Sequence, residues 1–308
     1  MSLIIDRNIP ALRELAHATI FELSPEKAAR QDISPLEIGI LNLMPSAAVE
    51  RTEAQLLRLL ANTPLQIRPT FVYFDEHRSG AKQSHFDEYY KTLRAVREHG
   101  LDGLVITGAN LEAYAFEDVY YWEELISFFD WAREGVTSTI YSCWSAHAAL
   151  YHRYGIAPER LGSKLLGVFE HRVLHKTGSP FLSGMDDEIL VPHSRWRGVS
   201  TRELAVHEEL EVLIESEAAG PHLVAGRGGR ELYLQGHPEY DRGDIAAEYA
   251  RDSAANIRIG FPEHYFPDND TAKLPRKNWG ANGQVFYCNW INWVYQTTNV
   301  DVHKPLMG

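Results

Sequence analysis

The stretch STIYSCWSAHAALYHRYG, residues 138–155, joins a short apolar run to a segment of helical character, with Cys143 at the junction. A cysteine at a sharp strand-to-helix turn lies beside the helix N-terminus, whose dipole favours the reactive thiolate. The backbone N–H of Trp144 is then placed to contribute to an oxyanion hole. The alternative is that Cys143 is a small buried apolar residue, which is the commoner fate of a free cysteine.

The chain before Cys143 alternates between short apolar runs and amphipathic segments. The expected strands are residues 36–43, 66–74, 103–108 and 138–142, and the expected helices are 47–60, 86–99 and 118–134, with Asp118 as an N-cap. Strands that are apolar on both faces and alternate with helices predict a mostly parallel α/β sheet with flanking helices. In such sheets the chemistry lies beyond the carboxyl ends of the strands, where Cys143 is found.

The second half of the chain has a more mixed α+β pattern. Shorter strands, some of them antiparallel, are expected at residues 165–174, 211–216, 222–226 and 231–236, and helices at 244–254 and 285–295. The glycine-rich GRGGR, residues 226–230, is interpreted as a hairpin turn. No repeat or linker interrupts the chain. We therefore expect one catalytic domain over residues 1–308, with the segment up to about residue 35 and the C-terminal aromatic helix as extensions.

Composition narrows the classes of function. The chain has 308 residues and a formal net charge of −12, which argues against nucleic acid or an anionic membrane as the main partner. No stretch approaches the roughly 18 apolar residues of a membrane span. Two cysteines, Cys143 and Cys288, do not make a disulfide framework. A reducing cytoplasm is the expected location.

A base for Cys143 is offered by QGHPEYD, residues 235–241. His237 and Glu239 stand two residues apart after an expected strand, so an extended chain would project them to the same side. Glu239 could then orient His237 or stabilise its charge. The three residues would then form a catalytic triad of nucleophile, base and orienting carboxylate, in the order Cys, His, Glu along the chain.

The sequence contains no standard motif for a metal site or a nucleotide site. Histidines are numerous, including His147, His152, His171, His175 and His193, but the sequence has no CxxC and no HExxH. Neither GxGxxG nor GxxxxGK[ST] occurs. We therefore expect no metal and no bound cofactor.

Nine segments, in order, resemble one known family. They are LNLMP (41–45), TEAQLLRLLANTPLQI (52–67), DGLVITGA (102–109), FEDVYYWEEL (116–125), SCWSAHAALYHRYGI (142–156), KLLGVFEH (164–171), PHSRW (192–196), GHPEYD (236–241) and NWINWVYQTT (289–298). The chain resembles the homoserine O-acyltransferases of methionine biosynthesis, the homoserine transsuccinylase type. The resemblance implies a flavodoxin-like sheet of the class I glutamine amidotransferase kind.

The resemblance also implies roles for particular residues. Cys143 matches the acyl-thioester nucleophile, His237 the general base and Glu239 its partner. Three further positions match substrate contacts: Lys164, Ser194 and Arg251. The implied reaction is ping-pong acyl transfer from an acyl-CoA co-substrate to homoserine, by an enzyme that forms a homodimer.

Donor choice in this family is linked to one position, which is glycine in succinyl-specific members and glutamate in acetyl-specific ones. Glu112 stands there. A glutamate would repel the free carboxylate of a succinyl group, so the expected donor is acetyl-CoA, with succinyl-CoA as the alternative.

Departures from the family pattern surround the expected pocket. Where the family usually reads CWGAQAGLYH, this chain has Ser145 and His147; Asn110 replaces a proline, and the segment 46–51 is about two residues longer. Homoserine is the expected acceptor, and serine or another hydroxy-amino acid is the alternative. Two other functions stay open, a class I glutaminase using the same three residues and a non-catalytic binding protein.

Overall fold

A computed structural model describes residues 2–6, 8–15, 22–24, 28, 34–74, 82–174 and 178–298. The chain forms two compact units. The first comprises residues 1–110, 114–140 and 287–308, and the second comprises residues 111–113 and 141–286. The expectation of one catalytic domain stays a prediction. His175 and residues 1, 7, 16–21, 25–27 and 29–33 of the expected N-terminal extension lie outside the described residues.

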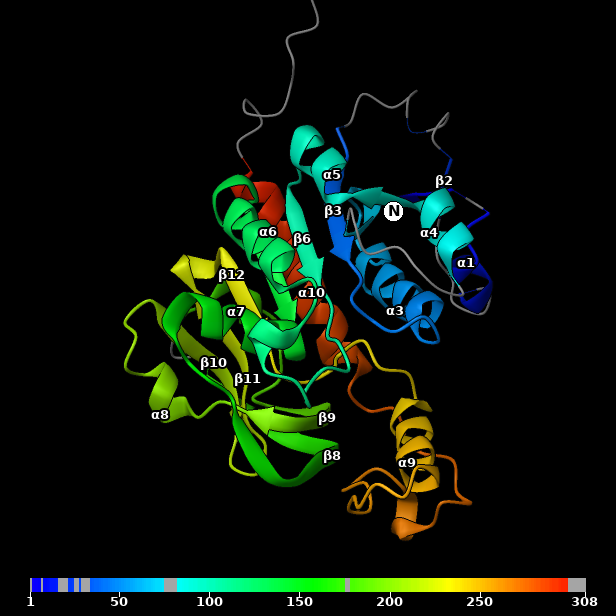
Figure 1. The fold of residues 1–308 in the computed structure, drawn as a ribbon, viewed down its shortest axis with the longest axis vertical. Helices are drawn as coiled ribbons and strands as arrows, with labels where there is room; N and C mark the ends of the chain where they lie inside the picture. Colours follow the sequence, from blue (N-terminus) through cyan, green and yellow to red (C-terminus); the bar gives the residue numbers. More distant parts are fainter. Residues whose placement is uncertain are drawn as a thin grey trace, which may run out of the picture. The chain divides into compact units, whose positions relative to one another are not determined.

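The first unit is built on a parallel sheet (Figure 1). Its strands are β1 (Ser2–Ile4), β2 (Glu22–Leu23), β3 (Leu36–Leu41), β4 (Gln66–Tyr73), β5 (Tyr90–Thr92), β6 (Gly103–Ile106) and the start of β7 (Ser138–Ser142). They follow the order β2-β1-β4-β3-β6-β7, with β5 beside β4. The pairs β3–β4 and β3–β6 are parallel, with Ile40 opposite Phe71 and Val105. The predicted parallel sheet is confirmed.

The helices of the first unit differ from the prediction in two places. They are α1 (Ala11–Glu14), α3 (Val49–Ala61), α4 (Gln83–Tyr89), α5 (Leu93–His99), α6 (Trp122–Gly135) and the greater part of α10 (Gly280–Thr297). The helix expected over 86–99 is wrong, because β5 divides it. Asp118 is not an N-cap, since it ends a short 3-10 turn, η1 (Phe116–Asp118), and α6 begins at Trp122 after an uncapped Tyr121.

The second unit carries a mainly antiparallel sheet. Its elements are α7 (Trp144–Tyr154), β8 (Glu159–Val173), η3 (Pro180–Leu182), β9 (Glu188–Gly198), α8 (Thr201–Leu204), β10 (Leu210–Ser216), β11 (Gly220–Gly226), η4 (Arg227–Gly229), β12 (Glu231–Leu234), α9 (Asp244–Ala254) and η5 (Pro267–Asn269). The strand order is β12-β11-β10-β8-β9. All four neighbouring pairs are antiparallel. The predicted mixed second half and the GRGGR turn are confirmed, and β9 is an additional strand.

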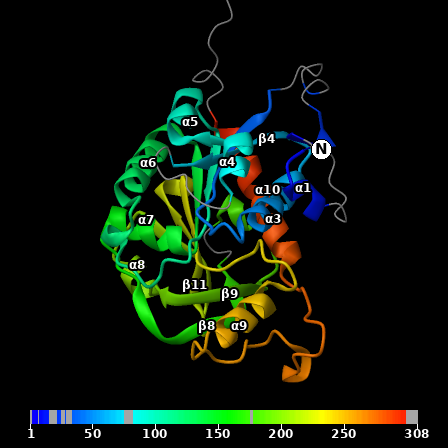
Figure 2. The ribbon, with the colours of Figure 1, turned by 45° about the vertical axis from the view of Figure 1, so that its right-hand side comes forward.

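One glycine joins α9 and its following loop to this sheet. Gly167 in β8 has φ +149°, and a Cβ there would collide with the backbone of Glu263. The two residues form an isolated bridge, with Val168 N–H donating to Glu263 O at 2.9 Å. A buried cluster fills the space beneath: Leu166, Val168, Ile245, Tyr265, Phe266 and Trp279. Figure 2 shows α9 beside β8 and β9.

Among the described residues, no helix combines the length and the apolar character that crossing a membrane requires.

Candidate active site

Cys143 occupies a strained turn between β7 and α7. Its φ and ψ are +52° and −114°, a conformation that residues other than glycine adopt at a cost of roughly 1–3 kcal/mol. Its N–H donates to Leu234 O at 2.7 Å. The hydroxyl of Ser145 accepts the Ser142 N–H at 2.9 Å and donates to Ser142 O at 3.0 Å. The predicted strand-to-helix turn at the cysteine is therefore present, and Ser145 braces it.

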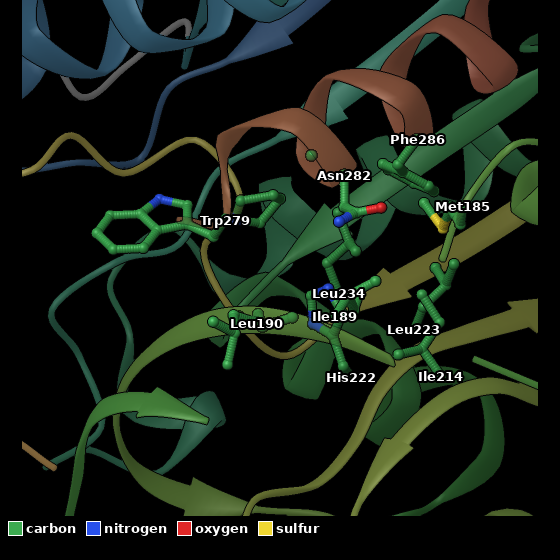
Figure 3. Close-up of a pocket in the computed structure, with 13 residues that line it drawn as sticks. Met185, Ile189, Leu190, Ile214, His222, Leu223, Leu234, Trp279, Asn282 and Phe286 are labelled. Atoms are coloured by element: carbon green, nitrogen blue, oxygen red, sulfur yellow. The ribbon is translucent and has the colours of Figure 1, made fainter. Parts of the chain in front are cut away.

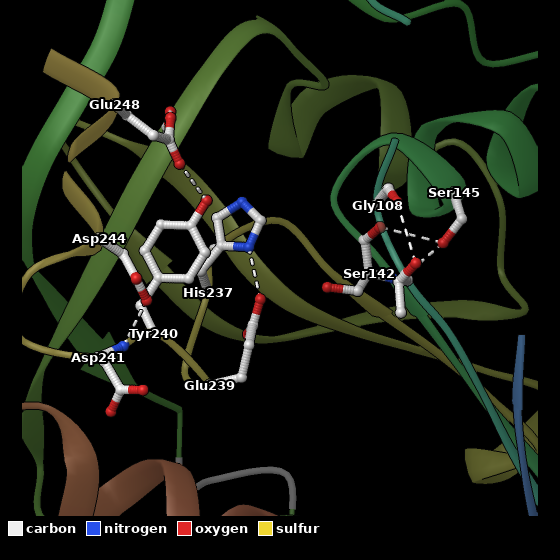
Figure 4. Close-up of polar contacts among 12 residues, drawn as sticks. Gly108, Ser142, Ser145, His237, Glu239, Tyr240, Asp241, Asp244 and Glu248 are labelled. Carbon is white, nitrogen blue, oxygen red and sulfur yellow. Dashed lines mark hydrogen bonds and ion pairs between the residues drawn. The ribbon is translucent and has the colours of Figure 1, made fainter. Parts of the chain in front are cut away.

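His237 follows β12 and is fixed by both backbone and side chain. Its N–H donates to Pro192 O at 2.8 Å, and its Nδ1 lies 2.7 Å from Glu239 Oε1 (Figure 4). The predicted pairing of His237 with Glu239 is confirmed, but the predicted extended chain is wrong. Tyr240 N–H donates to His237 O at 3.2 Å, which closes a turn and brings the two side chains together.

The charges around His237 favour its protonated form. Burial lowers its pKa, but Glu239 and Cys143 outweigh burial, and the pKa lies well above the ordinary value of 6.5. Since Glu239 takes Nδ1, Nε2 is the ring nitrogen left for Cys143. The imidazole and the carboxylate thus form a hydrogen-bonded pair, and Cys143 acts on the imidazole through its charge.

A second polar group lies where β8, β9 and α9 meet. Lys164 Nζ is 2.6 Å from Asp252 Oδ2 and 3.2 Å from Glu248 Oε2. The Ser194 hydroxyl also donates to Glu248 Oε2. Arg251 Nη2 lies 2.7 Å from Asp252 Oδ1, and its side chain is 55% exposed. The structure therefore brings together Lys164, Ser194 and Arg251, which the sequence pointed to separately.

Glu248 and Tyr240 connect this group to the histidine, and sequence reasoning missed both. Tyr240 donates to Glu248 Oε1 at 2.6 Å, and its ring stacks on His237 with a centroid distance of 4.2 Å (Figure 4). Burial raises the pKa of Glu248, but Lys164 and the hydroxyls of Ser194 and Tyr240 outweigh it and lower the pKa overall. Glu248 is therefore a half-buried carboxylate. Its only sequence signal was its position three residues before Arg251 on α9.

Glu112 lies on the three-residue segment of the second unit that precedes β7 in the chain. Its backbone oxygen accepts a hydrogen bond from Arg197 Nε at 3.0 Å. Burial raises the pKa of its carboxyl, while Lys164 and His237 favour the charged form and Glu248 opposes it. Its carboxyl is thus within electrostatic reach of both polar groups.

Trp144 is the first residue of α7, so its N–H lies at the helix start as the sequence suggested. Its part in an oxyanion hole stays a prediction. In the part of the chain that the structure describes, no three His, Cys, Asp or Glu side chains are grouped in a way that would hold a metal ion.

An apolar cavity lies behind the His237 loop (Figure 3). Leu190, Val191, Pro238, Trp279 and Phe286 are among its walls, and His222 is its one ionisable lining residue. None of the predicted site residues lines it. The cavity belongs to the packing that supports the loop.

Comparison with known proteins shows the family of the chain. Residues 2–300 match the model of a family described as homoserine O-succinyltransferase. The chain belongs to this family. It is 42% identical over 306 residues to the homoserine O-acetyltransferase of Lachnospira eligens, covering 99% of this chain and 98% of that one. It is 40% identical over 305 residues to the homoserine O-succinyltransferase of Pseudoalteromonas translucida, covering 98% and 96%. Family members of both names are thus about equally similar.

Proteins outside this family share the fold. A glutamine amidotransferase from Thermotoga maritima aligns with 85% of this chain and 99% of its own, with a TM-score of 0.54 and 11% identity. At that identity the likeness concerns the fold alone. The predicted class I glutamine amidotransferase-like fold is confirmed.

Proposed function

We propose that the protein transfers an acetyl group from acetyl-CoA to the hydroxyl of L-homoserine, through a thioester on Cys143, in methionine biosynthesis. The observation that carries this proposal is the His237–Glu239 pair, 2.7 Å apart, in the same unit as the strained turn of Cys143, in a member of this family. A nucleophile, a base and a group that orients the base are what acyl transfer needs.

In the first half-reaction the Cys143 thiolate attacks the acyl-CoA carbonyl. The tetrahedral intermediate collapses, the carbonyl–sulfur bond to CoA breaks, and CoA thiolate leaves. The His237 imidazolium supplies the proton for that sulfur. One thioester replaces another, so the step requires little net free energy. The N–H of Trp144 would serve the transient oxyanion.

The second half-reaction begins with a neutral His237. Acylation turns the Cys143 thiolate into an uncharged thioester, which removes one of the charges that raise the pKa of His237. The imidazole can then accept the proton of the homoserine hydroxyl as its oxygen attacks the thioester. Collapse releases O-acetylhomoserine and restores the Cys143 thiolate beside the His237 imidazolium.

The group around Glu248 fits an amino-acid acceptor. An amino acid carries one carboxylate and one ammonium, and this site offers charges of both signs. The partly exposed guanidinium of Arg251 is suited to the carboxylate, and the half-buried carboxylate of Glu248 to the ammonium. Lys164 and Ser194 hold Glu248 in place. This arrangement suits homoserine, and it also leaves serine as the alternative acceptor.

Glu112 supports acetyl-CoA as the donor. Its carboxyl interacts electrostatically with Lys164, Glu248 and His237. A succinyl group would bring a second carboxylate towards it, whereas an acetyl group brings no charge. We further propose a cytoplasmic enzyme, acting as a homodimer and without a bound cofactor.

Release of CoA tests the proposal directly. Purified protein is incubated with acetyl-CoA or succinyl-CoA and with homoserine, serine or glutamine, and Cys143→Ala is the control. We expect CoA release with acetyl-CoA and homoserine, and an acetyl group on the Cys143 peptide when the acceptor is omitted. Ammonia release from glutamine without CoA release would contradict the proposal and support a glutaminase. An unmodified Cys143 would support a non-catalytic protein.

A further inference from the structure

Tyr240 contacts both polar groups of the site, yet the mechanism above gives it no step. Its ring lies on the His237 imidazole, with the ring centroids 4.2 Å apart and an angle of 16° between the two planes. At the far end of the same ring, its hydroxyl donates to Glu248 Oε1 at 2.6 Å (Figure 4). One rigid side chain therefore contacts both the proposed base and the proposed partner of the acceptor's ammonium.

The main chain of Tyr240 is held on both sides. Its N–H donates to His237 O at 3.2 Å, and its carbonyl oxygen accepts from Trp279 Nε1 at 2.9 Å. Tyr240 also packs against the buried cluster that includes Leu166 and Trp279. A tyrosine has only two side-chain torsions, so these contacts leave its ring little freedom to move.

The stacked ring restricts the His237 imidazole where the hydrogen bond to Glu239 does not. The contact of Nδ1 with Glu239 at 2.7 Å fixes the position of that nitrogen, but the ring can still tilt about it. The Tyr240 ring covers one face of the imidazole and limits this tilt. The direction of Nε2, the nitrogen left for proton transfer, thus depends on Tyr240.

The hydrogen bonds of Glu248 indicate where an ammonium can bind. Each carboxylate oxygen can accept two hydrogen bonds. Oε2 already accepts from Lys164 and Ser194, whereas among the described residues Oε1 accepts from Tyr240 alone. The oxygen with remaining capacity is therefore Oε1. An ammonium bound there lies next to the Tyr240 hydroxyl.

The Tyr240 hydroxyl keeps its proton. Burial, and then the charge of Glu248, raise its pKa well above the ordinary value of 10. The phenol is therefore a constant hydrogen-bond donor to Glu248 and exchanges no proton during acyl transfer. Its contribution to the reaction is geometric.

We propose that Tyr240 is a positioning residue that sets the span between the ammonium and the reacting hydroxyl of the acceptor, and so selects homoserine over serine. The inference rests on the proposed function and names what makes its site specific. The ring face holds the base and the hydroxyl holds Glu248, and a phenol cannot change its length. Serine is one methylene shorter than homoserine. With its ammonium at Glu248, its hydroxyl falls short of His237, and such a misplacement is costly in rate.

Separate measurement of the two half-reactions tests this role. Wild type, Tyr240→Phe and Tyr240→Leu are given acetyl-CoA alone, and acetylation of the Cys143 peptide is followed over time by mass spectrometry. KM and kcat/KM are then measured for homoserine and for serine. Phe keeps the ring on the imidazole and loses the hydroxyl. We expect it to be acetylated at the wild-type rate, with KM for homoserine raised and the preference for homoserine over serine lowered, each by about ten-fold.

Tyr240→Leu loses the ring as well as the hydroxyl. Acetylation of Cys143 should then also slow, by about 10–100-fold, because His237 is no longer held in place. Tyr249→Phe is the matched control, since it removes from α9 a hydroxyl that has no hydrogen-bond partner among the described residues. It should change neither the acetylation rate nor the preference between acceptors.

A wild-type preference in Tyr240→Phe would overturn the inference. An equal loss of acetylation in Phe and Leu would overturn it too, since that would indicate a structural role only. If Tyr240→Leu does not fold, Tyr240→Met supplies the same loss of the ring. A wild-type protein that forms no acetyl adduct would refute the proposed function itself, whereas an adduct with an unchanged preference in Tyr240→Phe would refute the role of Tyr240 alone.

Discussion

His237 depends on its neighbours for its charge. Burial by itself would keep the imidazole neutral, as it does for His193 and His222 in the same unit. What distinguishes His237 is the carboxylate at 2.7 Å and the adjacent cysteine, which together raise its pKa. The same side chain is thus a neutral packing group or a protonated imidazole, according to whether a negatively charged group lies beside it.

Glu239→Gln should therefore lower the pKa of His237, because burial remains while the largest favourable charge is lost. Titration of the ring by NMR should place the pKa of the variant clearly below that of wild type. We also expect kcat to fall by about 10²–10⁴-fold, the usual contribution of an oriented base. An unchanged pKa would show that Glu239 is not the group that controls the imidazole. Glu217→Gln, an exposed substitution, is the matched control.

Donor choice should depend on pH through Glu112. Burial raises the pKa of this carboxyl above its ordinary value of 4.5, so its charge is present above the raised pKa and is lost as pH falls through it. The preference for acetyl-CoA over succinyl-CoA, measured as the ratio of the two kcat/KM values, should weaken towards acidic pH. Glu112→Gln should remove the pH dependence of the ratio, and Glu112→Gly should improve use of succinyl-CoA. A ratio unaffected by either substitution would exclude Glu112 as the determinant.

At the scale of elements, the geometry of the site depends most on the position of strand β8. It carries Lys164, and three residues later it carries Gly167, where the backbone of Glu263 approaches too closely for any side chain. The approach anchors the loop after α9, the helix that supplies Glu248 and Arg251. Close backbone contact here fixes the distance between strand and helix.

Gly167→Ala should destabilise the protein by about 2–3 kcal/mol, because the new methyl group must displace the Glu263 backbone. KM for homoserine should rise as well, since α9 would move away from β8. The matched control is Gly162→Ala on the same strand, where a Cβ meets nothing within 4 Å and the change should stay within about 0.5 kcal/mol. Urea denaturation of the three proteins measures the difference. Similar midpoints for both variants would contradict this account.

The sequence predicted those elements whose pattern reflects burial or local chemistry. The apolar runs at 36–41 and 103–106 and the helix at 244–254 are of this kind. The division of 86–99 was not predictable from periodicity, because Tyr90 leaves the helix to pair with Phe71 and to donate to Glu53 at 2.6 Å. Strand β9 was missed since PHSRW is polar and contains proline. It is a strand because β8 pairs with it along most of its length.

The candidate site divides in the same way. Cys143 could be found because it stands at a single strand-to-helix turn. The His237–Glu239 pair could be found because its two residues are separated by only one residue in the chain. Glu248 had no such signal, because its partners Lys164 and Ser194 are 84 and 54 residues away in the chain.

At the scale of the whole molecule, the net charge of −12 should slow the approach of acyl-CoA, which is itself an anion. Raising the ionic strength from about 0.02 to 0.2 M should therefore increase kcat/KM for acetyl-CoA, by about two-fold, through screening of the repulsion. The same kinetic series with homoserine, whose net charge is zero, serves as the control and should change little. A decrease with salt would indicate a local positive surface that guides the CoA phosphates.

The anchoring of Glu112 bears on how such enzymes diverge. Arg197 holds this residue by its backbone oxygen, so any side chain at position 112 would keep the same attachment. A lineage could therefore exchange glutamate for glycine without loosening the segment that presents it, and without touching the cysteine, the base or the acceptor group. One codon could then redirect the enzyme between two acyl pools.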